Sequence, residues 1–174
     1  MDIKAIATAR LDWTGDLLAI GFYENEIELS GDLAALNTKL QGAIEVLIAE
    51  AEFKGAKSSS AVTRVGINTP IKKIMLVGLG KADEAKLDTL RKAGATIARA
   101  AKREKATTLG ISLPKWNGDS AATVQVVSEG LLLALHLDAA FVVALPDEHR
   151  HRVAGPFGGR SVFRGGAGCG HGSA

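Results

Sequence analysis

The sequence predicts an α/β fold of three layers, in which helices flank a parallel or mixed sheet. An apolar run of strand length, Ile71–Val77, ends in the turn Gly78–Lys81 and is followed by a helical pattern. Strand and helix patterns then alternate along most of the chain, an order typical of a sheet covered by helices. Hydrophobic residues make up 47% of the 174 residues, which is enough to build a sizeable core.

The N-terminal part of the chain predicts two strands and one helix. The strands are Ile3–Ala9 and Asp16–Tyr23, with a turn at Trp13–Gly15 between them. Of the two residues Ser30 and Asp32, Asp32 is the expected N-cap of the helix. A single apolar stripe with spacings of three and four residues continues the helix, through Leu33, Leu36, Leu40, Ile44, Leu47 and Ala51.

The middle of the chain predicts a loop, a strand and a second helix. Lys54–Ser60 is polar, Ala61–Ile67 has strand character, and Asn68–Pro70 forms the turn before the strand at Ile71–Val77. The helix extends roughly over Asp88–Lys105. Its expected inner face consists of Leu90, Gly94, Ile97 and Ala101.

The last predicted elements are a strand at Thr107–Leu113 and a third helix. Asp119 or Ser120 can cap this helix, which ends near Leu137. Its segment Leu131–Leu135 is apolar on nearly all sides, so we expect it to be buried. The predicted order is β-β-α-β-β-α-β-α.

Each predicted helix contains one interior glycine: Gly42, Gly94 and Gly130. Glycine destabilises a helix by about 1 kcal/mol relative to alanine. The three glycines therefore either allow a close approach of helix to sheet or are simply tolerated inside the helices.

The composition changes after Leu145. Residues 147–174 contain eight glycines, three histidines and four arginines, with neither helical nor strand periodicity. Such a segment cannot bury enough apolar surface to offset its ordering entropy. We therefore expect a folded domain at residues 1–138 and an aberrant, disordered tail at 139–174. A shifted or truncated reading frame in a GC-rich gene would produce such a tail, a hypothesis that resequencing of the locus tests.

Four segments together resemble the N-terminal domain of the leucine aminopeptidase (cytosol aminopeptidase) family. The strongest match is the strand and turn Lys73–Lys81. The others are Leu87-Asp88 at a helix start, Glu129–Leu135, and Ser30–Leu33 with the helix that follows it. Their order and spacing agree with the family from about residue 3 to residue 138.

The resemblance implies a macro-domain-like fold whose roles are assembly and the shaping of access to an active site. In this family a separate, larger C-terminal domain holds two divalent metals, manganese or zinc, and removes N-terminal residues, with leucine preferred. The full enzyme is usually a hexamer. Its metal-binding signature, Asn-Thr-Asp-Ala-Glu-Gly-Arg, is absent here, because Asn68-Thr69 is followed by Pro70. No catalytic, metal or cofactor residue therefore carries over, and we expect this chain alone to be inactive.

Gly78, Gly80 and Lys81 form a weak candidate phosphate site, since glycines can expose backbone N–H groups near a helix start. The spacing matches neither a Walker loop nor a dinucleotide fingerprint, so a plain turn is the simpler interpretation. Two other functions stay open. One is a free-standing macro-like module that binds a nucleotide or ADP-ribose at this turn, and the other is a non-catalytic protein that pairs with intact aminopeptidase subunits.

Histidines and the single cysteine offer metal-ligand chemistry in the C-terminal part of the chain. His149 and His151 form one pair, and Cys169 and His171 another, but a long glycine-rich gap separates them without a standard zinc spacing. Adventitious metal binding is the simpler interpretation. His136 has no evident catalytic partner and is expected to be a packed or surface histidine.

Charge and composition predict a cytoplasmic protein without nucleic-acid or membrane partners. The net charge of +2 belongs to residues 147–174, which leaves 17 basic and 17 acidic groups in residues 1–146. Lys102–Lys105 is expected to be a solvated helix end. No apolar stretch reaches the roughly 18 residues of a spanning helix, no secretory signal is evident, and one cysteine cannot form an internal disulfide.

Overall fold

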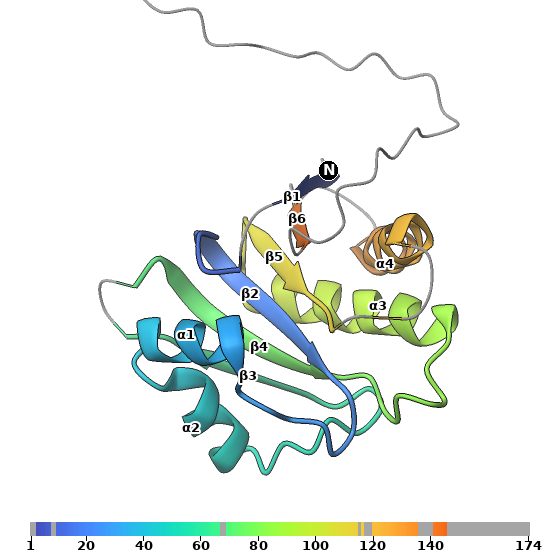
Figure 1. Cartoon of the computed structure of the whole chain (residues 1–174). Coiled ribbons are helices and arrows are strands. Elements are labelled where there is room, and N and C mark those ends of the chain that lie inside the picture. Colours follow the sequence, from blue (N-terminus) through green and yellow to red (C-terminus); the bar gives the residue numbers. More distant parts are fainter. Residues whose placement is uncertain are drawn as a thin grey trace, which may run out of the picture.

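A four-stranded mixed sheet lies between two pairs of helices in the computed structural model (Figure 1). The structure describes residues 3–7, 10–66, 69–114, 116, 120–135 and 141–145. In spatial order the strands are β3 (Ser60–Arg64), β4 (Ile71–Gly78), β2 (Gly15–Phe22) and β5 (Leu109–Ser112). β2 is parallel to both β4 and β5, whereas the edge strand β3 is antiparallel to β4.

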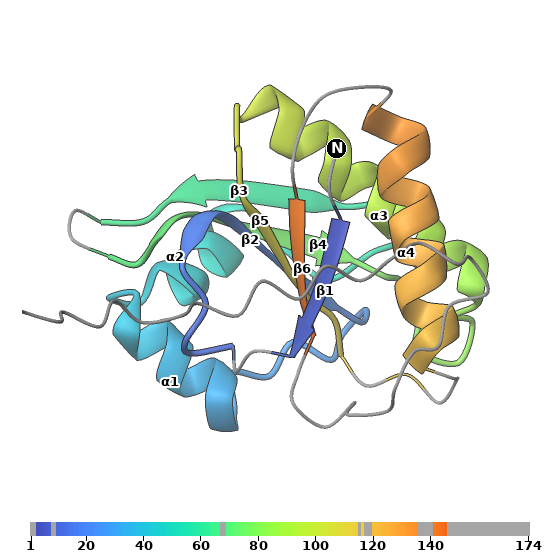
Figure 2. The same cartoon turned by 90° about the horizontal axis from the view of Figure 1, so that it is seen from above.

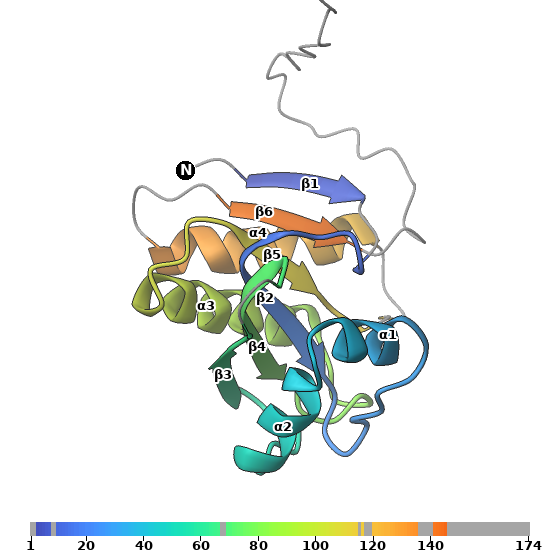
Figure 3. The ribbon, with the colours of Figure 1, turned by 90° about the vertical axis from the view of Figure 1, so that its left-hand side faces the viewer.

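A second, two-stranded parallel sheet pairs β1 (Ile3–Ala7) with β6 (Phe141–Leu145). β6 lies against β5, so the strands follow one another in the order β1-β6-β5-β2-β4-β3 (Figure 3). The sequence pattern did not reveal β6, which lies beyond the predicted domain boundary at residue 138. The division into residues 1–138 and 139–174 stays a prediction, and residues 146–174 lie outside the described residues.

The helices cover opposite faces of the four-stranded sheet, which confirms the predicted three layers (Figure 2). They are α1 (Gly31–Lys39), α2 (Ala43–Glu50), α3 (Leu87–Arg103) and α4 (Ser120–Leu135). Alternation along β2 divides the core, because successive side chains of a strand point to opposite faces. Leu17 and Ala19 pack with α3 and α4, whereas Leu18 and Ile20 pack with α1 and α2.

The single helix expected over residues 33–51 is in fact two helices, α1 and α2. Gln41 and Gly42 adopt positive φ angles of 58° and 80°, which interrupts the helix. The Asn37 side chain then accepts a hydrogen bond from the backbone N–H of Ile44 at 3.1 Å and so helps to begin α2. The apolar stripe continues through the break, so the periodicity alone could not show it.

The predicted N-cap of α1 was also wrong. Ser30 occupies the N-cap position with an extended backbone, and Asp32 lies inside the first turn. An acidic residue there still interacts favourably with the positive end of the helix dipole.

Gly94 and Gly130 mark a close approach between α3 and α4, rather than between a helix and the sheet. A Cβ on Gly94 would lie 2.6 Å from the Val127 carbonyl oxygen, and a Cβ on Gly130 would overlap the Arg91 carbonyl oxygen. The Arg91 guanidinium also reaches the Glu129 carboxylate at 3.0 Å. The two glycines therefore set the distance between these helices.

The expectation that all of Leu131–Leu135 is buried was wrong for two residues of α4. Leu131 and Leu135 are buried in the core. Leu132 and Leu133 have 52% and 71% of their surface exposed. Among the described residues they form a pair of adjacent exposed leucines.

Asp16 joins the beginnings of three strands. Its carboxylate accepts hydrogen bonds from Lys72 Nζ at 2.6 Å, from the backbone N–H groups of Thr107 and Thr108, and from the Thr107 hydroxyl. The hydrogen bonds from Lys72 and Thr107 hold the pKa of Asp16 well below its usual range. Because the folded-state pKa is lowered, this stabilisation is present above the unfolded pKa of about 4 and is lost as the pH falls below it.

Replacing Asp16→Asn should therefore lower the free energy of unfolding by about 1–3 kcal/mol at neutral pH, because an amide cannot accept all of these hydrogen bonds. The loss of stability on acidification below about pH 5 should also become shallower than in the parent chain. Urea unfolding at a series of pH values measures both effects, with Asp12→Asn, at an exposed position, as the control. An unchanged pH dependence in Asp16→Asn would contradict this assignment.

None of the helices among the described residues combines the length and the apolar character needed to cross a bilayer.

Candidate functional site

In the glycine turn at the end of β4, three backbone N–H groups form hydrogen bonds with other parts of the chain. The N–H groups of Gly78, Leu79 and Gly80 all donate to backbone carbonyl groups. The acceptors are the oxygens of Ser59 at 2.9 Å, Phe22 at 2.9 Å and Gly55 at 3.0 Å. A phosphate cradle needs such N–H groups to point at the ligand, so this geometry favours the structural interpretation of the turn.

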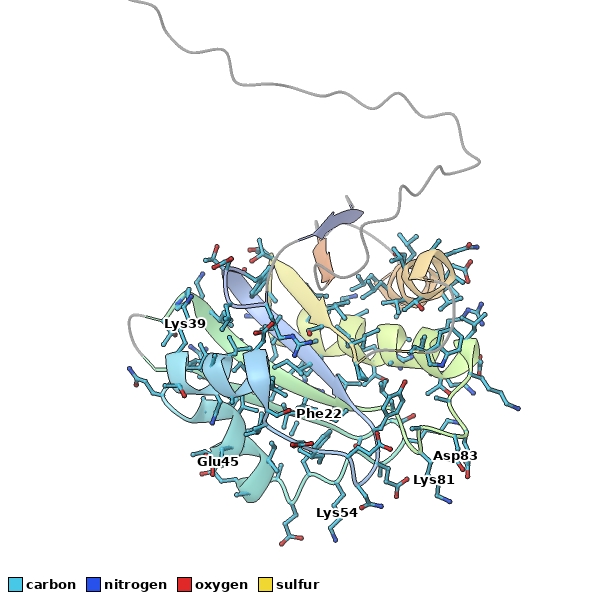
Figure 4. The ribbon with its side chains drawn as sticks, in the orientation of Figure 1. Phe22, Lys39, Glu45, Lys54, Lys81 and Asp83 are labelled. Carbon is cyan, nitrogen blue, oxygen red and sulfur yellow. The ribbon has the colours of Figure 1, made fainter. Side chains whose placement is uncertain are left out.

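The other parts of the turn agree with that interpretation. A Cβ on Gly78 would overlap the Ala56 carbonyl oxygen, so this glycine permits the loop at residues 55–59 to lie against the end of β4. The Lys81 side chain is 60% exposed on the loop after β4 (Figure 4). It pairs with Glu84 at 3.3 Å. Hydrogen bonding and charge from Glu84 raise the pKa of Lys81.

A pocket of about 140 Å³ opens instead at the carboxyl ends of β2 and β5. This edge of an open α/β sheet is where ligands commonly bind. The pocket is lined by Arg10, Ile20, Gly21, Phe22, Tyr23, Glu26, Glu28, Leu33, Ser112, Leu113 and Pro114. No motif in the sequence indicated it, because its walls come from residue 10, from residues 20–33 and from residues 112–114, which are far apart in the chain.

Ser112, the last residue of β5, lines this pocket and carries a buried hydroxyl. It is only 5% exposed, and its Oγ has no hydrogen-bond partner among the described residues. Ser112 lies opposite Ile20 in the register between β2 and β5. Leaving a buried polar group unsatisfied costs about 1–3 kcal/mol, and this Oγ has almost no accessible surface of its own.

Three charged side chains line the same pocket without ion pairs to other described residues. They are Arg10, which precedes β2, and Glu26 and Glu28, which lie between β2 and α1. Burial, together with the charge of Glu26, raises the pKa of Tyr23 above its ordinary value. The pocket is thus lined by one cationic and two anionic side chains, and Glu26 and Glu28 are exposed to solvent.

The remaining predicted positions form no further site in the described part of the chain. Glu104, expected within a solvated helix end, instead receives hydrogen bonds from Lys73 Nζ to its carbonyl oxygen at 2.7 Å and to its carboxylate at 2.9 Å. This contact with Lys73 lowers the pKa of Glu104. His136 and the predicted ligand set of His149, His151, Cys169 and His171 lie outside the described residues.

The fold first defines a class, the macrodomain-like α/β domains. The macrodomain of Trypanosoma brucei, solved with ADP-ribose, superposes with a TM-score of 0.60 at 17% identity, covering 84% of this chain and 64% of that one. Tomato leucine aminopeptidase, solved as a mutant, superposes with a TM-score of 0.70 at 25% identity, covering 84% of this chain and 32% of that one. These similarities confirm the predicted fold class.

The sequence comparison then gives the family. Residues 19–141 match the family described as "Cytosol aminopeptidase family, N-terminal domain", and the chain belongs to this family. A probable cytosol aminopeptidase of Cyanothece sp. (strain PCC 7425 / ATCC 29141) is 57% identical over 141 residues, which are 81% of this chain. The chain spans only 29% of that relative's length. The predicted family is thereby confirmed.

Proposed function

We propose that the chain serves as a non-catalytic N-terminal domain of a leucyl aminopeptidase, where it contributes to assembly and shapes access to the active site. The proposal rests on the extent of the sequence match. The match includes 81% of this chain but only 29% of the length of a probable cytosol aminopeptidase. The matched residues belong to the family's N-terminal domain.

The activity assigned to the whole protein is metal-dependent release of N-terminal amino acids, with a pair of manganese or zinc ions held outside this domain. Among the described residues, no cluster of three or more His, Cys, Asp or Glu side chains is arranged to bind a metal. Cytoplasmic location and assembly as a homo-oligomer, or with other aminopeptidase subunits, also belong to the proposal. Nucleic acid and membrane are not among the proposed partners.

A peptide-release assay tests the proposal directly. The purified 174-residue chain is incubated with a leucyl substrate and with manganese or zinc, and a complete cytosol aminopeptidase serves as the positive control. We expect no release above the buffer blank. Release that increases with the concentration of the chain and disappears with a chelator would contradict the proposal.

The exposed pair Leu132 and Leu133 is proposed as part of the contact with the remainder of such an enzyme, since adjacent exposed leucines are typical of interaction surfaces. In the isolated chain, the same pair should promote self-association. The double replacement Leu132→Gln/Leu133→Gln should reduce self-association without lowering the melting temperature. Light scattering over a range of concentrations measures this effect.

The control for that experiment is Val46→Gln, because Val46 is 52% exposed on α2, far along the chain from α4. It should leave self-association unchanged. A parent chain that stays monodisperse at high concentration would contradict the proposed role of the leucine pair.

An alternative function is the binding of a nucleotide or ADP-ribose, which the similarity to the Trypanosoma brucei macrodomain supports at the level of fold. Two observations weigh against it. The pocket measures about 140 Å³, whereas pockets for drug-sized ligands measure about 300–1,000 Å³. Its two carboxylates also outnumber its one guanidinium, which disfavours a diphosphate. Calorimetry with ADP-ribose separates this alternative from the main proposal. A further alternative, a non-catalytic protein that pairs with intact aminopeptidase subunits, is tested by co-purification with a complete aminopeptidase.

A further inference from the structure

The edge strand β3 directs part of its backbone away from the sheet. In an antiparallel pair, successive residues of a strand alternately bond to the neighbouring strand and point away from it. Just before β3, Gly78 N–H donates to the Ser59 carbonyl oxygen at 2.9 Å. Just after it, Val65 N–H donates to the Lys72 carbonyl oxygen at 3.0 Å. The odd-numbered residues therefore bond to β4, and the residues whose N–H and C=O groups point outward are Ser60, Val62 and Arg64.

These outward groups are open to a partner strand. β3 occupies one end of the row of strands (Figure 3). The three outward N–H groups have no backbone acceptor among the described residues. Of the outward carbonyl groups, that of Arg64 lies 3.5 Å from the Thr63 hydroxyl. Ser60 and Arg64 are exposed and Val62 is half-buried, so both ends of the strand can be reached from solvent.

β3 also lacks the features that commonly prevent an edge strand from pairing, which include a proline, a bulge and a charge within the strand. Its register with β4 continues without interruption from Ser60 to Arg64. It contains no proline, and its one charge belongs to its last residue. β1, at the other end of the row, contains Lys4 within the strand. The sequence of β3 therefore leaves this edge of the sheet available for pairing.

The outward side of β3 is complementary to itself. A two-fold axis at Val62 would place Val62 opposite its counterpart and each Ser60 opposite the partner's Arg64, so that all outward groups pair in about six backbone hydrogen bonds. The two Arg64 residues would then lie at opposite ends of the pair, about 14 Å apart at 3.4 Å per residue. This separation exceeds the screening length of about 8 Å at physiological ionic strength, so their repulsion is small.

We propose that two copies of this chain associate through antiparallel pairing of their β3 strands, which joins the two sheets into one continuous sheet. Five residues from each copy form a small interface, so the association is weak and depends on concentration. The pairing follows from the strand alone. Its use in the assembly of an aminopeptidase rests on the proposed function.

Sedimentation equilibrium of the 174-residue chain tests the pairing. The chain carries Leu132→Gln/Leu133→Gln in this experiment, so that the exposed leucines of α4 do not contribute to association. We expect reversible dimers at protein concentrations up to about 1 mM, the range of weak complexes. Monomers at every concentration would overturn the proposal. Assemblies that grow beyond dimers would also overturn it, since a two-fold pair is closed.

Replacements of the exposed Ser60 assign the dimer to this strand and register. Ser60→Arg places an arginine opposite the partner's Arg64 at both ends and should raise the dissociation constant by about tenfold, because like charges directly opposite destabilise a strand pair. Ser60→Glu should lower it, and Ser60→Arg/Arg64→Glu should reverse the loss. Ala35→Arg adds the same charge at an exposed position of α1 and should change nothing.

The opposite signs expected for Ser60→Arg and Ser60→Glu distinguish pairing from damage to the fold, which would weaken the dimer in both. A dissociation constant that neither replacement changes, or that both change in the same direction, would overturn the proposal. The peptide-release assay separates this inference from the proposed function. Dimers without peptidase activity support both, a monomeric chain removes only the strand pairing, and peptidase activity removes only the non-catalytic role.

Discussion

Gly78→Ala should destabilise the domain by about 3 kcal/mol, the upper end of what overpacking a tight site costs. The added methyl group would overlap the carbonyl oxygen of Ala56, and a backbone oxygen cannot rotate away as a flexible side chain can. Relief requires the loop at residues 55–59 to move. That movement would strain three backbone hydrogen bonds, which are Gly78 N–H to Ser59 at 2.9 Å, Ser58 N–H to Gly78 at 3.1 Å and Gly80 N–H to Gly55 at 3.0 Å.

Urea unfolding followed by circular dichroism measures this change. Gly66→Ala is the matched control, because a Cβ there would meet only the end of the flexible Gln41 side chain, at 3.0 Å. The control should change the free energy of unfolding by less than about 0.5 kcal/mol. Equal stability of Gly78→Ala and Gly66→Ala would show that the turn does not pack as described.

Gly130→Ala should lower the free energy of unfolding by about 1–3 kcal/mol, although alanine favours a helix over glycine by about 1 kcal/mol. Helix propensity and packing therefore predict opposite signs. The Arg91 carbonyl oxygen lies where the new Cβ would be placed, so α3 and α4 must separate. Separation would also loosen the ion pair between Arg91 and Glu129.

Thermal and urea unfolding measure the effect of Gly130→Ala. Arg99→Ala, at an exposed position of α3, controls for surface substitution and should change stability by less than about 0.5 kcal/mol. Gly94→Ala should destabilise as well, and the double variant should lose less than the sum of the two single losses, since one separation of the helices relieves both contacts. A gain in stability for Gly130→Ala would contradict the close packing of these helices.

The layers of the fold could be predicted from the sequence because buried helices and strands repeat their apolar residues at a regular spacing. The apolar run of β4 and the inner face of α3, with Leu90, Gly94, Ile97 and Ala101, are buried as expected. In these elements the side chains themselves carry the signal, since each fits one face of a helix or the interior of a sheet.

A helix break or a short strand that leaves the spacing of the apolar residues unchanged could not be predicted in the same way. The break between α1 and α2 at Gly42 does not disturb the stripe that leads from Leu36 to Ile44. β6 is only five residues long and borders a segment without periodicity. The short run alone gives no reason to expect its parallel pairing with β1, which lies more than a hundred residues away.

The pocket illustrates the same limit for a candidate site. The glycine turn drew attention because Gly78 and Gly80 form a local motif, yet their N–H groups are used within the fold. Ser112 and Ile20 carry no motif, and they line one pocket because β5 and β2 are neighbours in the sheet. Spatial order of strands, rather than spacing in the sequence, places these groups together.

The most direct test of the central claim, that this domain holds no catalytic metal centre, is a crystal structure of the 174-residue chain soaked in manganese, with anomalous scattering used to locate the ions. We predict no pair of adjacent ions bridged by carboxylates of this chain. Two manganese ions about 3.5–4 Å apart, the separation typical of two-metal hydrolases, and held by its Asp or Glu side chains, would contradict the account.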